Sequence, residues 1–267
     1  MHVKKNNLNF INWFVGFSEG NGHWDVIKDK NHCRVTFLIS QKNPQVLYCI
    51  KKFFGFGIVK GPFKDKTLGS YYFQYYVSRQ DHIKVLLETI NGKLIFQKSK
   101  DTFEKCVIAY NSLSTVQSTL IQVFPKNNNN LPSYNNSWLS GFVDASGCFS
   151  GHVKSDWSAI TLQFSFIKRC DETQIFEHLR ILMGGSLEHV NGSHSYLIVV
   201  GESDIQELIK YLEKYKLRSD KNVLFVRFKK IHVRLTSPDF EWSSLGRRAQ
   251  QRLKTLVTNL NMHFEKN

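Results

Sequence analysis

Two stretches of the chain, Trp13-Phe-Val-Gly-Phe-Ser-Glu-Gly-Asn-Gly22 and Trp138-Leu-Ser-Gly-Phe-Val-Asp-Ala-Ser-Gly147, align without a gap. Tryptophan, phenylalanine and two glycines stand at the same places in both, and the acids Glu19 and Asp144 also coincide. Self-similarity within a chain indicates that it is built from related structural parts. The alignment therefore predicts two similar halves.

The similarity continues beyond these stretches in the same order. Residues 37–57 resemble residues 164–185, and residues 77–83 resemble residues 199–205. The segment 125–137 is rich in asparagine and contains two prolines, which is typical of a connection between folded parts. We therefore expect a first repeat over 1–124, a linker over 125–137 and a second repeat over 138–267.

Each half shows the same succession of hydrophobic patterns. In the first half, Val35, Phe37 and Ile39 alternate with polar residues, and residues 160–166 of the second half alternate in the same way. This period of two is typical of antiparallel strands with one polar face. Helical spacing follows over 171–183 and 204–215. The chain is therefore expected to be α+β, with two pseudo-symmetric αββαββα halves.

Composition limits the classes of partner. The 267 residues include 36 Lys+Arg against 22 Asp+Glu, which gives a net charge of +14, and 42% are hydrophobic. A basic chain with enough apolar residues for a core attracts polyanions as a folded protein. We expect nucleic acid as the partner and no membrane, because no apolar run approaches the ~18 residues of a membrane span.

The cysteines and the amino-acid composition indicate the cellular compartment in which the protein is expected. The five cysteines are odd in number and form no C-x-x-C pair, which argues against a disulfide framework and against a zinc site. Lysine, asparagine, phenylalanine, isoleucine and tyrosine, all encoded by AT-rich codons, are abundant. We therefore expect an organelle-encoded protein located in the mitochondrion or another organelle matrix.

The repeated stretches also place small residues at helical spacing. Gly16 and Gly20 in the first copy correspond to Gly141 and Ala145 in the second. Small residues four apart lie on one face of a helix and allow two backbones to approach closely. We expect these four residues to form an interface between two helices, along the pseudo-two-fold axis of a monomer.

The two motifs resemble those of the LAGLIDADG homing endonucleases, in the single-chain form that carries two motifs, and the resemblance covers essentially the whole chain. It implies paired motif helices flanked by two antiparallel sheets that form a saddle over a nucleic-acid duplex. It also implies two acids that bind Mg²⁺ at a site where both DNA strands are cleaved. Carboxylates bind hard cations, and these cations neutralise charge on the attacking and leaving oxygens.

The chain departs from this family pattern where the metal would bind. The family's metal-binding acid stands just before the last glycine of the motif, and Asn21 and Ser146 occupy these places. Both are uncharged, so they are weak candidates for a metal and we expect no catalytic residue there. Glu19 and Asp144 are retained acids two residues earlier, about 200° away around a helix. No cofactor is expected to be required, and Mg²⁺ is expected only if cleavage is retained.

Three functions are compatible with these observations. The first is an RNA-binding group I intron maturase, a splicing factor whose DNA cleavage is lost or weakened, and it favours RNA over DNA as the partner. An alternative is an active, site-specific double-strand DNA homing endonuclease that uses Glu19 and Asp144. A second alternative is a structural RNA-binding component of an organellar ribonucleoprotein such as the mitochondrial ribosome.

Basic side chains in both halves are the candidate contacts to nucleic acid. A predicted amphipathic helix over 245–257 contributes the last four, which are expected to contact phosphates. The candidates are Arg34, Lys51, Lys52, Lys60, Lys64, Lys66, Lys154, Lys168, Arg169, Lys229, Lys230, Arg247, Arg248, Arg252 and Lys254.

Overall fold

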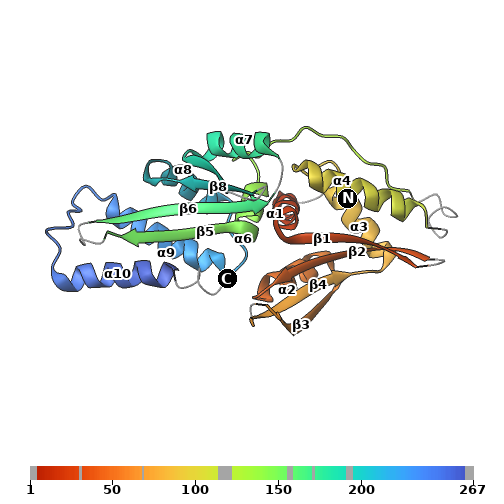
Figure 1. Cartoon of the computed structure of the whole chain (residues 1–267), viewed down its shortest axis with the longest axis horizontal. Helices are drawn as coiled ribbons and strands as arrows, with labels where there is room; N and C mark the ends of the chain where they lie inside the picture. Colours follow the sequence, from red (N-terminus) through yellow and green to blue (C-terminus); the bar gives the residue numbers. More distant parts are fainter. Residues whose placement is uncertain are drawn as a thin grey trace. The chain divides into compact units, whose positions relative to one another are not determined.

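A computed structural model describes residues 5–29, 32–67, 69–113, 122–154, 159–169, 172–190 and 195–261 (Figure 1). The chain divides into two compact units, Met1–Ala145 and Ser146–Asn267. Each unit holds one four-stranded antiparallel sheet with helices packed against it. No helix in the described ranges combines the length and the apolar character that crossing a bilayer requires.

The first unit contains four strands and the two helices that carry the repeated motifs. Its elements are α1 (Lys5–Asn21), β1 (Gly22–Asp29), β2 (His32–Gln41), α2 (Gln45–Phe54), β3 (Ile58–Lys64), β4 (Tyr71–Val77), α3 (Gln80–Ile90), α4 (Gln97–Asn111) and α6 (Trp138–Ser146), which ends at the boundary between the units.

The second unit repeats the strand pattern and adds a further helix. Its elements are β5 (Gly147–Val153), β6 (Ile160–Arg169), α7 (Thr173–Met183), β7 (Ser186–Val190), β8 (Ser195–Val200), α8 (Glu202–Lys214), α9 (Lys221–Leu235) and α10 (Arg247–Asn261). The helices expected over 171–183 and 204–215 correspond to α7 and α8. Residue 171 lies outside the described residues.

The two sheets have the same topology. Their strand orders are β1-β2-β4-β3 and β5-β6-β8-β7, and all neighbouring strands are antiparallel. Corresponding phenylalanines lie at corresponding places, since Phe37 pairs with Trp24 and Phe164 pairs with Phe149. This arrangement confirms the α+β fold with two halves of antiparallel strands.

Alternation along the strands separates a core face from a polar face. Val35, Phe37 and Ile39 of β2 are at most 1% exposed, whereas Arg34 and Ser40 are exposed. The helices α2, α3 and α4 pack against this sheet through apolar residues such as Leu47, Leu86 and Val107. The opposite face of the sheet carries mainly polar side chains, together with the exposed Ile27 and Ile58.

The segment expected to link the repeats follows the surface of the first unit. Residues 122–137 contain no helix or strand. The side chain of Asn91 donates to the Phe124 carbonyl at 2.7 Å and accepts from the Lys126 N–H at 2.8 Å, and Asn130 donates to the Gly92 carbonyl at 3.1 Å. These bonds fasten the segment to the end of α3.

Candidate nucleic-acid interface

The motif helices α1 and α6 pack so closely that a side chain has no room at two positions. A Cβ atom on Gly16 would overlap the Trp138 carbonyl, and a Cβ atom on Gly141 would overlap the Trp13 carbonyl. A Cβ atom on Gly20 would likewise overlap the Cβ of Ala145. The four small residues named from the sequence therefore lie at the contact between the two helices.

Each motif acid is bound by the tryptophan that begins the other motif. Trp13 Nε1 donates to Asp144 Oδ2 at 2.8 Å, and Trp138 Nε1 donates to Glu19 Oε2 at 2.7 Å. Both acids are buried, with 6% of Glu19 and 1% of Asp144 exposed. The pair of bonds repeats the symmetry of the sequence and joins α1 to α6.

Glu19 also contacts the start of α4. Its carboxylate accepts the backbone N–H groups of Ile95 and Phe96 at 2.9–3.1 Å. Burial raises the pKa of Glu19 from 4.5 to about 7, and the hydrogen bonds from Phe96, Trp138 and Ile95 act in the opposite direction. A side chain so enclosed joins α1 to α6 and to the start of α4, and it is not open to a substrate or to a metal ion.

The positions that the family pattern assigns to metal-binding acids carry an amide and a hydroxyl. Asn21 Nδ2 donates to the Ala145 carbonyl at 3.3 Å, so this side chain also serves the contact between α1 and α6. Hard divalent cations favour charged oxygen ligands. Within the described ranges, no group of three or more His, Cys, Asp or Glu residues could hold a metal ion. Asn21 and Ser146 supply no such charge.

The polar face of the first sheet presents hydrogen-bonding groups in rows. Ser40, Gln74 and Lys60 lie in register across β2, β4 and β3. Gln74 Nε2 donates to Ser40 Oγ at 3.4 Å. Lys60 Nζ lies 4.3 Å from the centre of the Tyr76 ring, within the range of a cation–π contact. This face offers donors, acceptors and positive charge to a ligand.

The polar face of the second sheet is nearly neutral where it is described. Ser150 pairs with Gln163, and His152 pairs with Thr161. His152 and Thr161 are exposed, whereas Phe149 and Phe164 on the other face are at most 2% exposed. Neutral amides and hydroxyls of this kind can hydrogen-bond base edges without a net charge.

The structure distributes the predicted basic contacts over different surfaces. Arg34 and Lys60 lie on the polar face of the first sheet, whereas Lys51 and Lys52 end α2, which packs on the opposite face. The others are placed as follows: Lys64 ends β3, Lys66 lies in the following turn, Lys154 follows β5, Lys229 and Lys230 lie on α9, and Arg247, Arg248, Arg252 and Lys254 lie on α10.

Three of the predicted contacts have partners within the protein, and the cation–π contact of Lys60 with Tyr76 is the first. Lys229 forms an ion pair with Glu213, and Lys254 Nζ lies 5.8 Å from the centre of the Trp242 ring. The side chains of Lys168 and Arg169 lie outside the described residues. Sequence spacing alone does not distinguish a lysine that has a partner from one that is free to contact a ligand, because the partners lie elsewhere in the sequence.

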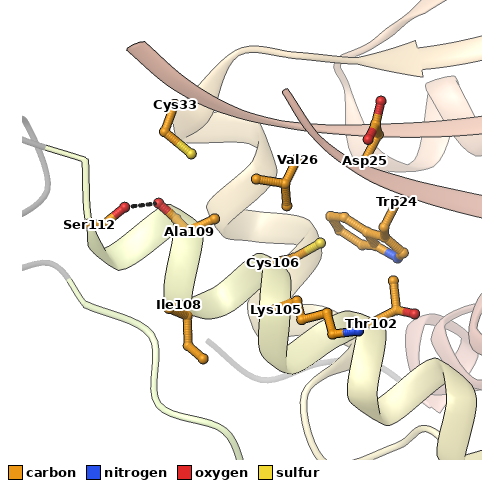
Figure 2. Close-up of a pocket in the computed structure, with 10 residues that line it drawn as sticks. All are labelled: Trp24, Asp25, Val26, Cys33, Thr102, Lys105, Cys106, Ile108, Ala109 and Ser112. Atoms are coloured by element: carbon orange, nitrogen blue, oxygen red, sulfur yellow. Dashed lines mark hydrogen bonds between the residues drawn. The ribbon is translucent and has the colours of Figure 1, made fainter. Parts of the chain in front are cut away.

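A cavity of about 560 Å³ that the sequence did not indicate lies between α4 and the β1–β2 strands (Figure 2). Its lining includes Trp24, Val26, Cys33, Cys106 and Lys105. Burial raises the pKa of the Cys106 thiol to about 12, so this sulfur stays protonated and is a poor nucleophile. The lining also includes the polar residues Asp25, Thr102 and Ser112.

Comparison with known proteins agrees with the fold and the motifs. The sequence profile described as LAGLIDADG endonuclease matches residues 14–110 and 139–232, which is more than half of the chain. The chain belongs to the LAGLIDADG endonuclease family. The matched segments contain both sheets and the motif-bearing parts of α1 and α6, whereas α10 lies beyond them.

Two proteins named as intron-encoded endonucleases share part of the chain's sequence. It is 27% identical over 230 residues to "Probable intron-encoded endonuclease 4" of Neurospora crassa, which covers 82% of this chain and 39% of the relative. It is 23% identical over 207 residues to "Intron-encoded DNA endonuclease ai2a" of Dictyostelium discoideum, which covers 78% and 60%. The chain thus spans about two to three fifths of the length of these relatives.

Solved LAGLIDADG structures share the fold over almost the whole chain. The homing endonuclease I-GzeII in complex with its DNA target has a TM-score of 0.72 at 21% identity and covers 93% of this chain and 97% of its own. I-SmaMI bound to cleaved DNA has a TM-score of 0.73 at 21% identity and covers 94% and 97%. At this identity the likeness establishes the fold.

Proposed function

We propose that this protein binds duplex DNA at specific sites through the polar faces of its two sheets, and that its DNA cleavage is lost or strongly weakened. The polar faces carry the first part of the proposal. Each is formed by antiparallel strands with side chains that hydrogen-bond, and each lies opposite a face buried against helices.

Groove geometry supports DNA over double-stranded RNA as the ligand of these faces. The major groove of B-DNA admits a β-ribbon and exposes a distinct pattern of donors and acceptors for each base pair. The major groove of A-form RNA is deep and narrow, so side chains cannot read it. The solved structures of I-GzeII and I-SmaMI also have DNA as the bound molecule. The expectation that RNA is the favoured partner has no support in these comparisons.

Selection from a library of random DNA duplexes tests site-specific binding. We expect a preferred sequence to emerge, and Arg34→Gln with Lys60→Gln to weaken binding to it by about tenfold or more, since each good contact contributes about 1–3 kcal/mol. The control is Lys98→Gln with Lys105→Gln, which removes equal charge from the exposed side of α4. Recovery of random sequences after repeated rounds would argue against specific recognition.

The loss of cleavage rests on the residues at the metal positions. Asn21 and Ser146 supply no negative charge, and Glu19 and Asp144 are held by tryptophans. We expect the protein with Mg²⁺ or Mn²⁺ to leave a plasmid that carries its selected site intact. Asn21→Asp combined with Ser146→Asp is expected to produce metal-dependent cleavage, measured as linear plasmid.

The endonuclease alternative predicts a different result. If Glu19 and Asp144 serve catalysis, the unaltered protein linearises the plasmid and Glu19→Gln abolishes the reaction while DNA binding persists. Cleavage by the unaltered protein would overturn the proposed loss of activity and leave the proposed DNA binding intact.

The genomic setting remains a proposal as well. The related curated proteins are named as intron-encoded, and the composition is rich in residues with AT-rich codons. We infer that the reading frame lies within an organellar intron, which sequencing of the locus tests. A maturase role or a place in an organellar ribonucleoprotein stays a prediction, tested by stimulated splicing of that intron or by copurification with ribosomal subunits.

A further inference from the structure

The last helix, α10, presents a basic surface that the sheets do not account for. Arg248, Gln251, Arg252, Thr255 and Leu256 recur at spacings of three and four and border a shallow, open depression on the exposed side of the helix. Residues at these spacings lie on one helical face. The exposed Arg247 adjoins the same face. We define the α10 basic face as these six residues.

The opposite side of α10 is fixed to the second unit. Leu253, Val257 and Leu260 are buried, and α10 packs against β5 and α9. Asn261 Nδ2 donates to the Gly151 carbonyl at 2.7 Å, and the Gly151 N–H donates to Asn261 Oδ1 at 3.1 Å. The apolar side of this amphipathic helix is therefore occupied and is not available for insertion into a bilayer.

The arginines of the α10 basic face are not neutralised by the protein. Arg247, Arg248 and Arg252 form no ion pair with any residue that the structure describes. No acidic residue occurs between Glu241 and Glu265. Half of the chain's arginines lie between Arg227 and Arg252, so arginine is concentrated in this region of a chain rich in lysine.

The placement of these arginines is unfavourable for the helix itself. Arg247 and Arg248 stand in the first turn, where the positive end of the helix dipole repels cations, and that turn contains no acid. Arg248 and Arg252 are one turn apart, and like charges at this spacing destabilise a helix. A ligand that neutralises the arginines would remove both penalties.

The α10 basic face is distinct from the polar face of the second sheet. Phe149 points away from that polar face and contacts Phe225 and Phe228 of α9, at ring distances of 5.8 and 5.2 Å. The helix α10 packs beside α9 and along the edge strand β5. The polar face carries Ser150, His152, Thr161 and Gln163 and, within the described residues, little charge. In the described part of the second unit, positive charge and base-reading groups thus occupy separate surfaces.

From this arrangement we infer that the α10 basic face is a second nucleic-acid-binding surface, which holds a sugar–phosphate backbone independently of base sequence. Guanidinium groups bind phosphates in bidentate geometry, and Gln251 and Thr255 can donate to phosphate or sugar oxygens. Contacts to phosphate and sugar oxygens position a protein on nucleic acid and carry no base sequence directly. RNA and DNA share this backbone, and both bind.

Salt-dependent binding of a short random DNA duplex and of a short random single-stranded RNA tests the inference in the full chain. The combined change Arg247→Gln, Arg248→Gln and Arg252→Gln is expected to weaken binding of both probes by about tenfold or more. Each lost phosphate contact lowers the slope of log affinity against log salt by about 0.7–0.9, so the slope falls by about 2–3.

A matched variant separates this surface from overall charge. Lys98→Gln, Lys105→Gln and Lys214→Gln also remove three exposed cations, from α4 and α8, and are expected to change affinity less than about threefold. The arginine variant should unfold at an unchanged or higher temperature, because it relieves charge repulsion. Equal effects of the two triple variants, or an unchanged salt slope, would overturn the inference.

Two further measurements identify the surface and the ligand. A photoreactive benzophenone on Thr255→Cys, in a Cys49→Ser background, is expected to cross-link both probes, and no cross-link would count against the inference. If the arginine variant loses only binding to phosphatidylserine vesicles, the surface belongs to a membrane. The variant Arg34→Gln with Lys60→Gln is expected to lose binding to the selected DNA site and to keep the Thr255→Cys cross-link. Failure of site-specific binding by the sheets is thereby distinguished from failure of backbone binding by the α10 basic face.

Discussion

Glu19 and Asp144 serve the contact between the motif helices. Each accepts a hydrogen bond from a tryptophan of the other helix, at 2.7 and 2.8 Å, and each is buried. The close approach at Gly16 and Gly141 brings tryptophan and acid within reach. The presence of acidic residues at positions 19 and 144 is therefore explained by the contact between the helices, without a role in DNA cleavage.

Replacing Trp13 by phenylalanine keeps an aromatic ring and removes the N–H that binds Asp144. Since a buried acceptor that loses a donor costs about 1–3 kcal/mol, we expect Trp13→Phe to lower the free energy of unfolding by that amount. Urea denaturation measures it. In a double-mutant cycle with Asp144→Asn the two effects should not add, and simple additivity would contradict a direct interaction.

The raised pKa of Glu19 predicts a pH-dependent stability. Its pKa is about 7 when folded and near 4.5 when unfolded, so the folded state favours the protonated form. The stabilisation is present below pH 4.5 and is lost as the pH rises through 7, by about 3 kcal/mol in total. In urea denaturation at pH 5 and pH 8, Glu19→Gln should remove this part of the pH dependence.

The exposed Glu104 on α4 provides the matched control for this titration. Glu104→Gln removes the same charge from the surface and should leave the pH dependence of the unfolding free energy as it is in the unaltered protein. If Glu19→Gln and Glu104→Gln gave the same pH profile, burial of Glu19 would not be its source.

Among the elements, α10 depends on one side chain at its last turn. Asn261 satisfies both backbone groups of Gly151 on the edge strand β5. A Cβ atom on Gly151 would lie 3.1 Å from Val257 Cγ1, so the glycine allows the helix to approach. The helix thereby covers part of a strand edge that would otherwise be open to other chains.

We expect Asn261→Ala to loosen α10 from β5. Two hydrogen bonds to the backbone are lost, which lowers the free energy of unfolding by about 1–3 kcal/mol and increases amide hydrogen exchange in α10. Asn259→Ala, two residues earlier on the same helix, is the control and should change exchange little. Equal exchange in both variants would show that the apolar contacts hold the helix alone.

Periodicity predicted most of the strands and helices, because burial on one face repeats at a fixed spacing. Val35, Phe37 and Ile39 identify β2, and the basic helix expected over 245–257 is observed over 247–261. Periodicity did not show that Lys229 pairs with Glu213, nor that α4 and β1 enclose a cavity. Such contacts join residues from distant parts of the chain, and one sequence does not specify their distances.

At the scale of the whole molecule, the compact units do not begin and end where the repeats do. The second repeat begins at Trp138, yet α6 belongs to the first unit as far as Ala145. The rings of Trp138 and Phe142 lie 6.0 and 5.4 Å from that of Phe96, at the start of α4. Packing against α1 and α4 therefore decides where this helix belongs.

The unit boundary predicts how fragments of the chain fold. A fragment of residues 1–145 retains α6 and should unfold cooperatively in urea, whereas a fragment of residues 1–124 exposes the α1 surface that Trp138 and Phe142 cover. Loss of large buried aromatic contacts costs about 3–5 kcal/mol each, so the shorter fragment should be less stable by at least about 3 kcal/mol. A fragment of residues 1–136 keeps the bonds that join Asn91 and Gly92 to the connecting segment but lacks α6, and should resemble the shorter fragment. If it matched the longer one instead, the connecting segment would be the source of stability, and the repeat boundary would be the true limit of the unit.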